Sequence, residues 1–316
     1  MGTAGVAGLA VAFAATACDD LIRAGRAAAG TSAEAAPTAQ EQPPAEQPGA
    51  PAPRAEAGER DAPQLLGEPA WEGERSAVGE ELGEIFAEER VEGVVVVHDL
   101  RTGATLRSDG ARAARRFPPA GTFDIPLGLI ALESGAVAGA YETVAPADGH
   151  SDAEPTNLAT AFRTSPSWFT RELSHRIGGE SLRAWLRRIG YGNADAGDAD
   201  ATFWLTGPLA ISADEQIGFL RRLQAGQLPF STRAQDALRE LMVLERGDGW
   251  LLRGKTGWQS GRHDRLWFVG WVERGEEAAF FAIEFENATR GRDVGALRER
   301  IYRRVLTQLG LVPARR

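Results

Sequence analysis

The side chains available for chemistry in this chain are hydroxyls, amines and carboxylates. Cys18 is the only cysteine among 316 residues, which excludes an intramolecular disulfide and a cysteine-based zinc site. The four histidines are scattered and show no H-x-x-x-H spacing. We therefore expect a site that uses neither a metal nor a cofactor.

Several short polar motifs follow one another along the chain. Lys255-Thr256-Gly257 is a weak signal by itself, because such a tripeptide is more often a surface turn than a site. The other motifs are PAGTFDIP at 119–126, SPS at 165–167, YGN at 191–193, FWLTGPLAISA at 203–213 and WFVGW at 267–271. Their fixed order, rather than any one of them, carries the argument.

This series closely resembles the motifs of class D serine β-lactamases (oxacillinases), of the penicillin-binding transpeptidase superfamily. That family reads P-A-S-T-F-K-I-P, S-x-V, Y-G-N, F-W-L-x-G-x-L-x-I-S, K-T-G and W-W-V-G-W in the same order. The resemblance extends from about Val94 to Leu311. It implies an α+β fold, β-lactamase/transpeptidase-like, in which both chain ends form a central antiparallel sheet flanked by helices.

Two positions depart from the family pattern. The family's S-x-x-K serine is acylated by the β-lactam, and its lysine, carboxylated by CO2, is the general base. These positions are Gly121 and Asp124 here. Glycine offers no oxygen for an acyl-enzyme, and the aspartate stem is too short to place its carboxylate beside a water near the substrate carbonyl. We predict that acyl-transfer catalysis is lost.

Thr122 is the hydroxyl nearest to the altered nucleophile position. Adjacent residues at a helix start point about 100° apart, so we expect Thr122 to face the core or to cap the helix. It is therefore a poor replacement for the nucleophile.

The rest of the motif set keeps its polar groups. The resemblance assigns Ser165 to the hydroxyl that relays a proton to the β-lactam nitrogen. It assigns Lys255 and Thr256 to the wall that meets the substrate carboxylate, while Gly257 lets the strand backbone approach the ligand. Near the C-terminus, Arg298 is the candidate carboxylate-binding arginine, with Arg300 as its competitor and a solvated helix-face charge as the alternative for either.

Two aromatic and polar positions complete the site prediction. Trp204 matches the tryptophan that packs on the carboxylated lysine, so its indole N–H could donate to Asp124, or the ring could simply be core. Ser167 stands where the family has valine, which places a hydroxyl against a wall that was apolar. This difference fits a pocket that no longer excludes water from a lysine carbamate.

Three classes of function remain open. The leading hypothesis is a pseudoenzyme that binds a β-lactam, a peptidoglycan-like carboxylate or a partner without turnover. The second is a serine-type hydrolase, a β-lactamase or D,D-peptidase relative, with a rearranged nucleophile or a water activated by Asp124. The third is a non-binding structural domain whose pocket has collapsed. Lys255, Thr256 and Ser165 argue against the third, because a collapsed pocket has no use for three polar groups.

The pattern of apolar residues predicts the elements that must position these groups. A β-branched run at 94–98, turn residues at 99–103 and a partner at 104–108 indicate a hairpin. Helices are expected at 125–134, 168–177, 182–189, 212–223 and 294–309, and strands at 250–254, 266–272 and 279–285. Ser212 and Glu215 have capping-box spacing. Strands at both ends with helices between them favour an α+β domain.

The N-terminal segment predicts export. An apolar run at 5–17 is too short to span a bilayer, so residues 1–18 read as a signal peptide. Ala15-Thr16-Ala17-Cys18 resembles a lipobox, although no Lys or Arg precedes the run; the alternatives are a plain secretory signal or a misplaced start codon. Residues 19–64 are rich in Ala, Pro and Glu and predict a disordered tether, with the class D-like domain at 65–316.

The charge balance narrows the partners. Lys and Arg number 35 against 44 Asp and Glu, a net charge of −9, which argues against nucleic acid and against membrane binding by basic charge. We expect a periplasmic or cell-surface protein of the cell envelope that meets a membrane only through a lipid anchor.

Overall fold

The computed structural model describes residues 75–146, 153–199 and 202–314, which lie within one unit, Asp61–Arg316. The strands are β1 (Glu92–Asp99), β2 (Thr105–Arg107), β3 (Val243–Gly247), β4 (Trp250–Gln259), β5 (Asp264–Arg274) and β6 (Glu277–Asn287). The helices are α1 (Arg75–Glu88), α2 (Gly110–Ala114), the 3₁₀ turn η1 (Ala120–Phe123), α3 (Asp124–Ser134), α4 (Leu158–Thr164), α5 (Ser167–Ile177), α6 (Gly179–Ile189), α7 (Ala213–Gln224), α8 (Thr232–Leu241) and α9 (Val294–Gln308).

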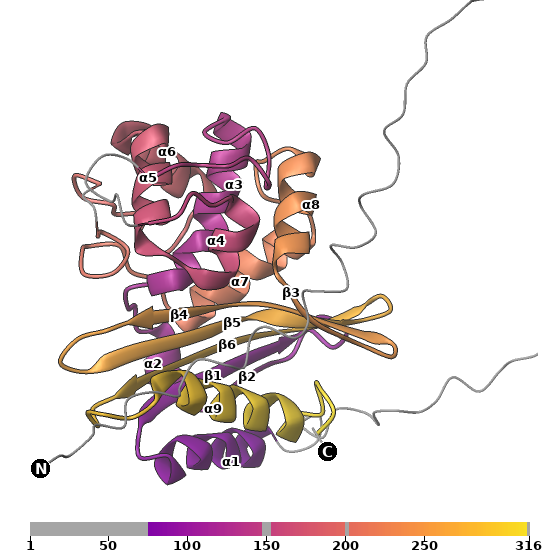
Figure 1. The fold of residues 1–316 in the computed structure, drawn as a ribbon. Coiled ribbons are helices and arrows are strands. Elements are labelled where there is room, and N and C mark those ends of the chain that lie inside the picture. The colour runs from indigo at the N-terminus through magenta and orange to yellow at the C-terminus, as the bar shows by residue number, and fades with distance from the viewer. Residues whose placement is uncertain (1–74, 147–152, 200–201, 315–316) are drawn as a thin grey trace, which may run out of the picture. The chain divides into compact units, whose positions relative to one another are not determined.

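One antiparallel sheet joins the two ends of the domain. Its order is β2-β1-β6-β5-β4-β3, and β1 pairs with β6 along its whole length, Glu92 opposite Glu286 and Asp99 opposite Ala279. The hairpin of β1 and β2 pairs His98 with Thr105. The α+β class and the shared sheet are therefore confirmed (Figure 1).

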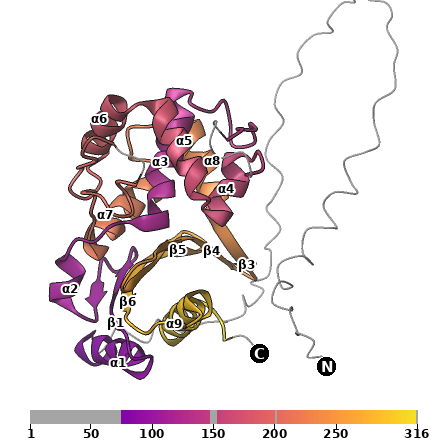
Figure 2. The same ribbon diagram turned by 60° about the vertical axis from the view of Figure 1, so that its left-hand side comes forward.

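The sheet is buried on both faces because alternate side chains enter two different cores. Val94 and Val96 of β1 belong to the core under the helical block, whereas Val95 and Val97 belong to the core under α1 and α9. Figures 1 and 2 show the same layers, with α1 and α9 on one side of the sheet and α3 to α8 on the other.

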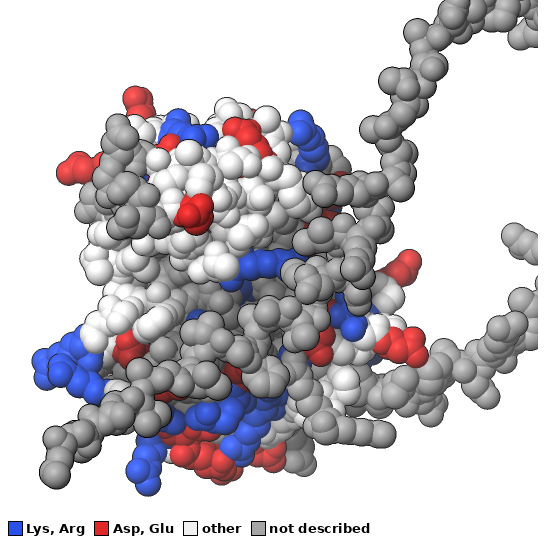
Figure 3. Space-filling view, viewed as in Figure 1, with Lys and Arg blue, Asp and Glu red and all other residues white. Residues whose placement is uncertain are grey.

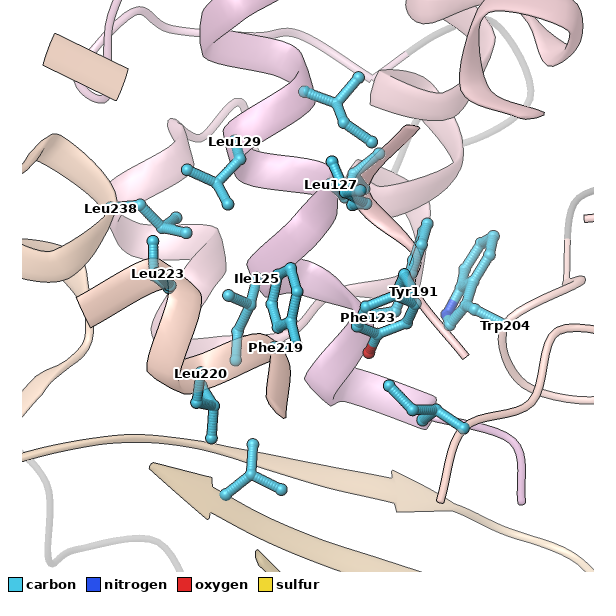
Figure 4. Packing of buried hydrophobic residues seen from close by; sticks show 14 of the residues in the cluster. Phe123, Ile125, Leu127, Leu129, Tyr191, Trp204, Phe219, Leu220, Leu223 and Leu238 are labelled. Atoms are coloured by element: carbon cyan, nitrogen blue, oxygen red, sulfur yellow. The ribbon is translucent and has the colours of Figure 1, made fainter. Parts of the chain in front are cut away.

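Helix α3 is the centre of the helical block and carries one end of the site. Residues 124–131 are all buried, as expected for a helix that is apolar on every side. Phe123, just before α3, packs edge-on against Phe203 and stacks on Trp204, with Tyr191 beside it (Figure 4). This aromatic packing fixes the direction in which the chain enters α3.

The sequence predicted most elements but not all of them. The capping box of Ser212 and Glu215 is present at the start of α7. The K-T-G motif, expected between a short strand and a turn, lies inside β4, which is ten residues long. Six elements were not predicted: α1, α2, η1, α4, α8 and β3. Helices α2 and α4 and strand β3 are short, with five to seven residues each, whereas α8 is ten residues long and has a regular apolar face.

The predicted signal peptide, tether, Cys18 and the boundary at residue 65 lie outside the described residues. In the part of the chain that the structure describes, no helix combines the length and apolar character needed to cross a membrane.

Candidate active site

The backbone around Gly121 packs directly against β4. A Cβ added at Gly121 would lie 2.9 Å from the Thr256 carbonyl oxygen and 3.3 Å from Ser165 Oγ. A Cβ on Gly257 would lie 3.0 Å from the Pro119 carbonyl oxygen. Real Cβ atoms do not lie closer than 3.0 Å to a backbone oxygen unless the neighbouring atoms move. The backbones of η1 and β4 therefore approach each other this closely because glycine stands at both 121 and 257.

The close approach also gives Gly257 a structural role. Its missing side chain is required by the packing of β4 against η1, as well as by any ligand at the strand edge.

Asp124 is the centre of a buried hydrogen-bond network. Its Oδ2 accepts from Ser165 Oγ at 2.8 Å and lies 3.0 Å from Lys255 Nζ, and its Oδ1 accepts from Thr170 Oγ1 at 3.2 Å. The side chains of Asp124 and Lys255 are 10% and 4% exposed. This is an ion pair largely withdrawn from water, and its opposite charges stabilise each other there.

Ser165 is held in a strained conformation at the end of α4. Its φ of 47° and ψ of 52° lie in the left-handed region, which non-glycine residues adopt only when the surroundings enforce it. Ser165 N donates to Ala161 O at 2.7 Å, and Pro166 follows and cannot continue the helix. The hydroxyl is thereby held between Asp124 and Lys255.

Lys255 faces Asp124 and Ser165 rather than the open space. Its Nζ donates to Ser165 Oγ and, at 3.4 Å, to the Thr256 carbonyl oxygen. All three ammonium protons therefore have acceptors. Its ring neighbour is Phe162, whose centroid lies 5.2 Å from Nζ. In the folded chain Lys255 is already paired and is not presented to a ligand.

The two C-terminal arginines are distinguished by their positions. Arg298 Nη1 donates to the Gly257 carbonyl oxygen at 3.2 Å, and burial lowers the pKa of the Arg298 guanidinium from its ordinary value. Arg300 is exposed and pairs with Glu89 at 3.2 Å. The geometry therefore favours Arg298 over Arg300 as the arginine at the site.

Arg298 reaches this carbonyl because β3 is short. Within the described sheet, β3 begins at Val243, opposite Arg253, so residues 255–259 of β4 have no strand on that side. The strand edge left open is the one that borders the site.

A pocket of about 270 Å³ opens above this network. This volume lies near the lower end of the range of small-molecule sites. The residues that line it are Gly121, Asp124, Arg163, Thr164, Ser165, Ser167, Thr170, Trp204, Leu205, Thr256, Trp258 and Arg298. The structure thus brings together all the predicted site residues within its range, with Lys255 and Gly257 just outside the lining.

Two further predictions can be compared with the geometry. Thr122 is fully buried, donates to the Pro119 carbonyl oxygen at 2.7 Å and accepts from Gln216, so it faces the core as expected. Trp204 is 2% exposed and stacks on Phe123; among the hydrogen bonds of the described residues, none joins its indole to Asp124.

Thr170 is the functional residue that sequence reasoning missed. It lies one helical turn after Ser167 on α5, on the face that also buries Phe169 and Leu173. A hydroxyl on an apolar helix face is the signal that could have found it, because a buried polar group needs a partner.

Within the described ranges, no group of three or more His, Cys, Asp or Glu side chains is placed to hold a metal ion. The charged and hydroxyl groups of the site are a carboxylate, five hydroxyls and two guanidiniums in the lining, with the Lys255 ammonium beside them.

Comparisons with known proteins agree with one another. Residues 93–307 match the family model described as "Penicillin binding protein transpeptidase domain". The chain is 38% identical to β-lactamase OXA-2 of Salmonella typhimurium over 236 residues, 72% of this chain and 84% of the relative, and 34% identical to OXA-48 of Klebsiella pneumoniae, covering 72% and 87%.

A solved structure gives the same result. FUS-1 (OXA-85), a class D β-lactamase from Fusobacterium nucleatum subsp. polymorphum, superposes with a TM-score of 0.68 at 32% identity, covering 74% of this chain and 98% of that one.

Proposed function

The chain belongs to the class D serine β-lactamase-like family with a penicillin-binding transpeptidase fold, and on that premise we propose that it is a pseudoenzyme. It binds a β-lactam or a peptidoglycan-like carboxylated ligand, or a partner that presents such a group, without forming an acyl-enzyme.

One observation carries this proposal. Position 121, which corresponds to the family's nucleophile, has no side chain, and a Cβ there would lie 2.9 Å from the Thr256 carbonyl oxygen. The carboxylate at Asp124 is engaged by Ser165, Thr170 and Lys255, and this pairing opposes its action as a base on a substrate. Neither a nucleophile at 121 nor a general base acting on it is present.

The pocket supports binding rather than collapse. It retains about 270 Å³, the Thr256 hydroxyl and the Arg298 guanidinium at the open edge of β4, and two tryptophans, Trp204 and Trp258, in its wall. A guanidinium and a hydroxyl can hold a carboxylate by charge-assisted hydrogen bonds, which do not require the nucleophile.

The hydrolase alternative rests on Ser165. Its hydroxyl donates to Asp124 at 2.8 Å, which is the geometry of a nucleophile beside a base. Two features oppose that role: Lys255 Nζ donates to the same hydroxyl oxygen and occupies one of its lone pairs, and Asp124 is ion-paired. We therefore keep binding without turnover as the function.

The test uses benzylpenicillin and the full chain. Intact-mass analysis should show no added drug molecule, nitrocefin hydrolysis should not exceed the rate in buffer, and calorimetry or ligand-observed NMR should detect weak binding. A mass gain of one drug molecule would overturn the proposal; its loss in Ser165→Ala would assign the adduct to the rearranged site. Absence of binding at millimolar penicillin, with the chain folded, would support the structural-domain hypothesis instead.

The place of action is part of the proposal. Export to the periplasm or the cell surface, with lipidation at Cys18, would bring the pocket to peptidoglycan. Metabolic labelling with a palmitate analogue, compared between the parent and Cys18→Ala, tests the anchor.

A further inference from the structure

The pocket carries more positive charge than one ligand carboxylate requires. Three cationic side chains lie in or beside it, Arg163, Lys255 and Arg298, and Asp124 is the only acidic residue in its lining. Since Lys255 and Asp124 neutralise each other, two guanidiniums are left.

Arg163 is the second of these guanidiniums. It lies in the last turn of α4, is exposed, and lines the pocket. In the part of the chain that is described, it makes no hydrogen bond or ion pair with another residue. Arg298 has only the Gly257 carbonyl oxygen as a hydrogen-bond acceptor in that same part, and Glu299, its neighbour on α9, does not line the pocket.

Several other arginines of the domain are instead paired with acidic side chains. On the side of α1 and α9, arginines and acidic residues intermix (Figure 3), and Arg292, Arg300 and Arg304 are all paired with Glu88 or Glu89. Arg163 differs from these three arginines because it meets no carboxylate within the described residues, although acidic residues outnumber basic ones in the chain.

The two arginines reach the pocket from different layers. Arg163 comes from α4 in the helical block, and Arg298 comes from α9 on the other side of the sheet (Figure 1). Trp204, Leu205 and Trp258 supply the apolar wall. The lining therefore combines one apolar wall and several hydroxyls with two cationic groups on separate elements.

We propose that the pocket selects dianionic ligands, with Arg298 and Thr256 holding one carboxylate and Arg163 holding a second anionic group on the same molecule. This inference rests on the proposed function and names the substrate class of that site. Arg163 is then a specificity-determining residue, because a monoanion can occupy the Arg298 position without it.

Two penicillins that differ by one carboxylate test the proposal. Benzylpenicillin is a monoanion, and carbenicillin is the same molecule with a second carboxylate on its side chain. At low ionic strength the full chain should bind carbenicillin about fivefold tighter, the scale of one partly exposed guanidinium–carboxylate contact. Added salt should reduce this ratio, since the contact is screened.

Variants assign the effect to one residue. Arg163→Gln should bring the ratio of the two dissociation constants to about one, because it weakens carbenicillin binding more than benzylpenicillin binding. Arg187→Gln is the matched control, because Arg187 is also exposed in the last turn of its helix, α6, and does not line the pocket. It should keep the parent's ratio.

The outcomes separate this inference from the proposed function. Equal binding of both penicillins, tighter binding of benzylpenicillin, or a ratio that survives Arg163→Gln would overturn the selection of dianions and leave penicillin binding intact. If neither penicillin binds to the folded chain, the proposed function fails and this inference fails with it.

Discussion

Replacement of Asp124 by asparagine should destabilise the domain strongly. The substitution removes the negative charge 3.0 Å from Lys255 Nζ and leaves a nearly buried ammonium without a counter-ion. At an effective dielectric constant near 20, the attraction at this distance is about 5 kcal/mol before desolvation is counted. Removal of one partner from a buried pair is known to reduce stability by about 3 to 5 kcal/mol. We expect Asp124→Asn to lower the free energy of unfolding by about 3 kcal/mol, since the asparagine oxygen retains one acceptor.

Urea denaturation followed by tryptophan fluorescence measures this change. The midpoint should fall while the denaturant slope stays constant. Asp236→Asn is the matched control: it removes the same charge from an exposed pair with Arg239, three residues apart on α8, and should change the stability by less than about 0.5 kcal/mol. Asp124→Asn combined with Lys255→Met should recover most of the loss, because no buried charge is then left unpaired.

The reasoning is refuted if Asp124→Asn is no more destabilising than Asp236→Asn. Lys255 provides an independent check, because it is the only lysine in the sequence. Selective ¹³C-lysine labelling therefore gives one side-chain signal, which should shift in Asp124→Asn. The same signal should respond little to benzylpenicillin, since the ligand carboxylate meets Arg298 and Thr256 rather than the paired ammonium.

Two further predictions concern repair and pH. Gly121→Ser with Asp124→Lys should give slow, bicarbonate-dependent acylation by a chromogenic cephalosporin; Gly121→Ala with Asp124→Lys, which makes the same contact with the Thr256 oxygen, should give none. A folded serine variant that acylates no faster than the parent would mean that the likeness is one of fold alone. Burial, with Arg221 and Arg107 nearby, lowers the pKa of His98 below 6.5, so the folded chain resists its protonation. Stability should be fully present above pH 6.5 and decline as pH falls below it, and this slope should be smaller in His98→Gln; identical slopes in urea titrations would exclude His98 as the cause.

The sequence predicted the parts of the fold that rest on local patterns. The hairpin, the capping box at Ser212 and the long helices follow from apolar period and capping residues, which are properties of neighbouring residues. Helix α8 could have been found in the same way, because Ser231 caps it through Ala234 N. The order of the strands required the family resemblance, since β1 and β6 pair across almost the whole domain.

The sequence predicted which residues form the site but not the contacts between them. The motifs identified Asp124, Ser165 and Lys255, whereas their closed network depends on η1 and β4 meeting backbone to backbone. That approach exists because glycine stands at both 121 and 257. A spacing rule cannot supply it, because the distance between two elements is set by packing over the whole core.

The two departures from the family pattern are linked by charge. The family resemblance places a lysine carboxylated by CO2 at position 124. Its carbamate carries a negative charge, whereas the same lysine without CO2 would be a second buried ammonium beside Lys255. Asp124 supplies a permanent negative charge at that position, 3.0 Å from Lys255 Nζ. Under the proposed function, the substitution would remove the general base while Asp124 still balances the charge of Lys255. A lysine at 124 without its CO2 group would place two buried ammoniums together. A chain that carried Gly121 but kept a lysine at 124 would therefore depend on CO2 for its stability. Under the proposed function, Asp124 balances the Lys255 charge without CO2, and the Arg163 and Arg298 guanidiniums line the pocket where an anion would bind.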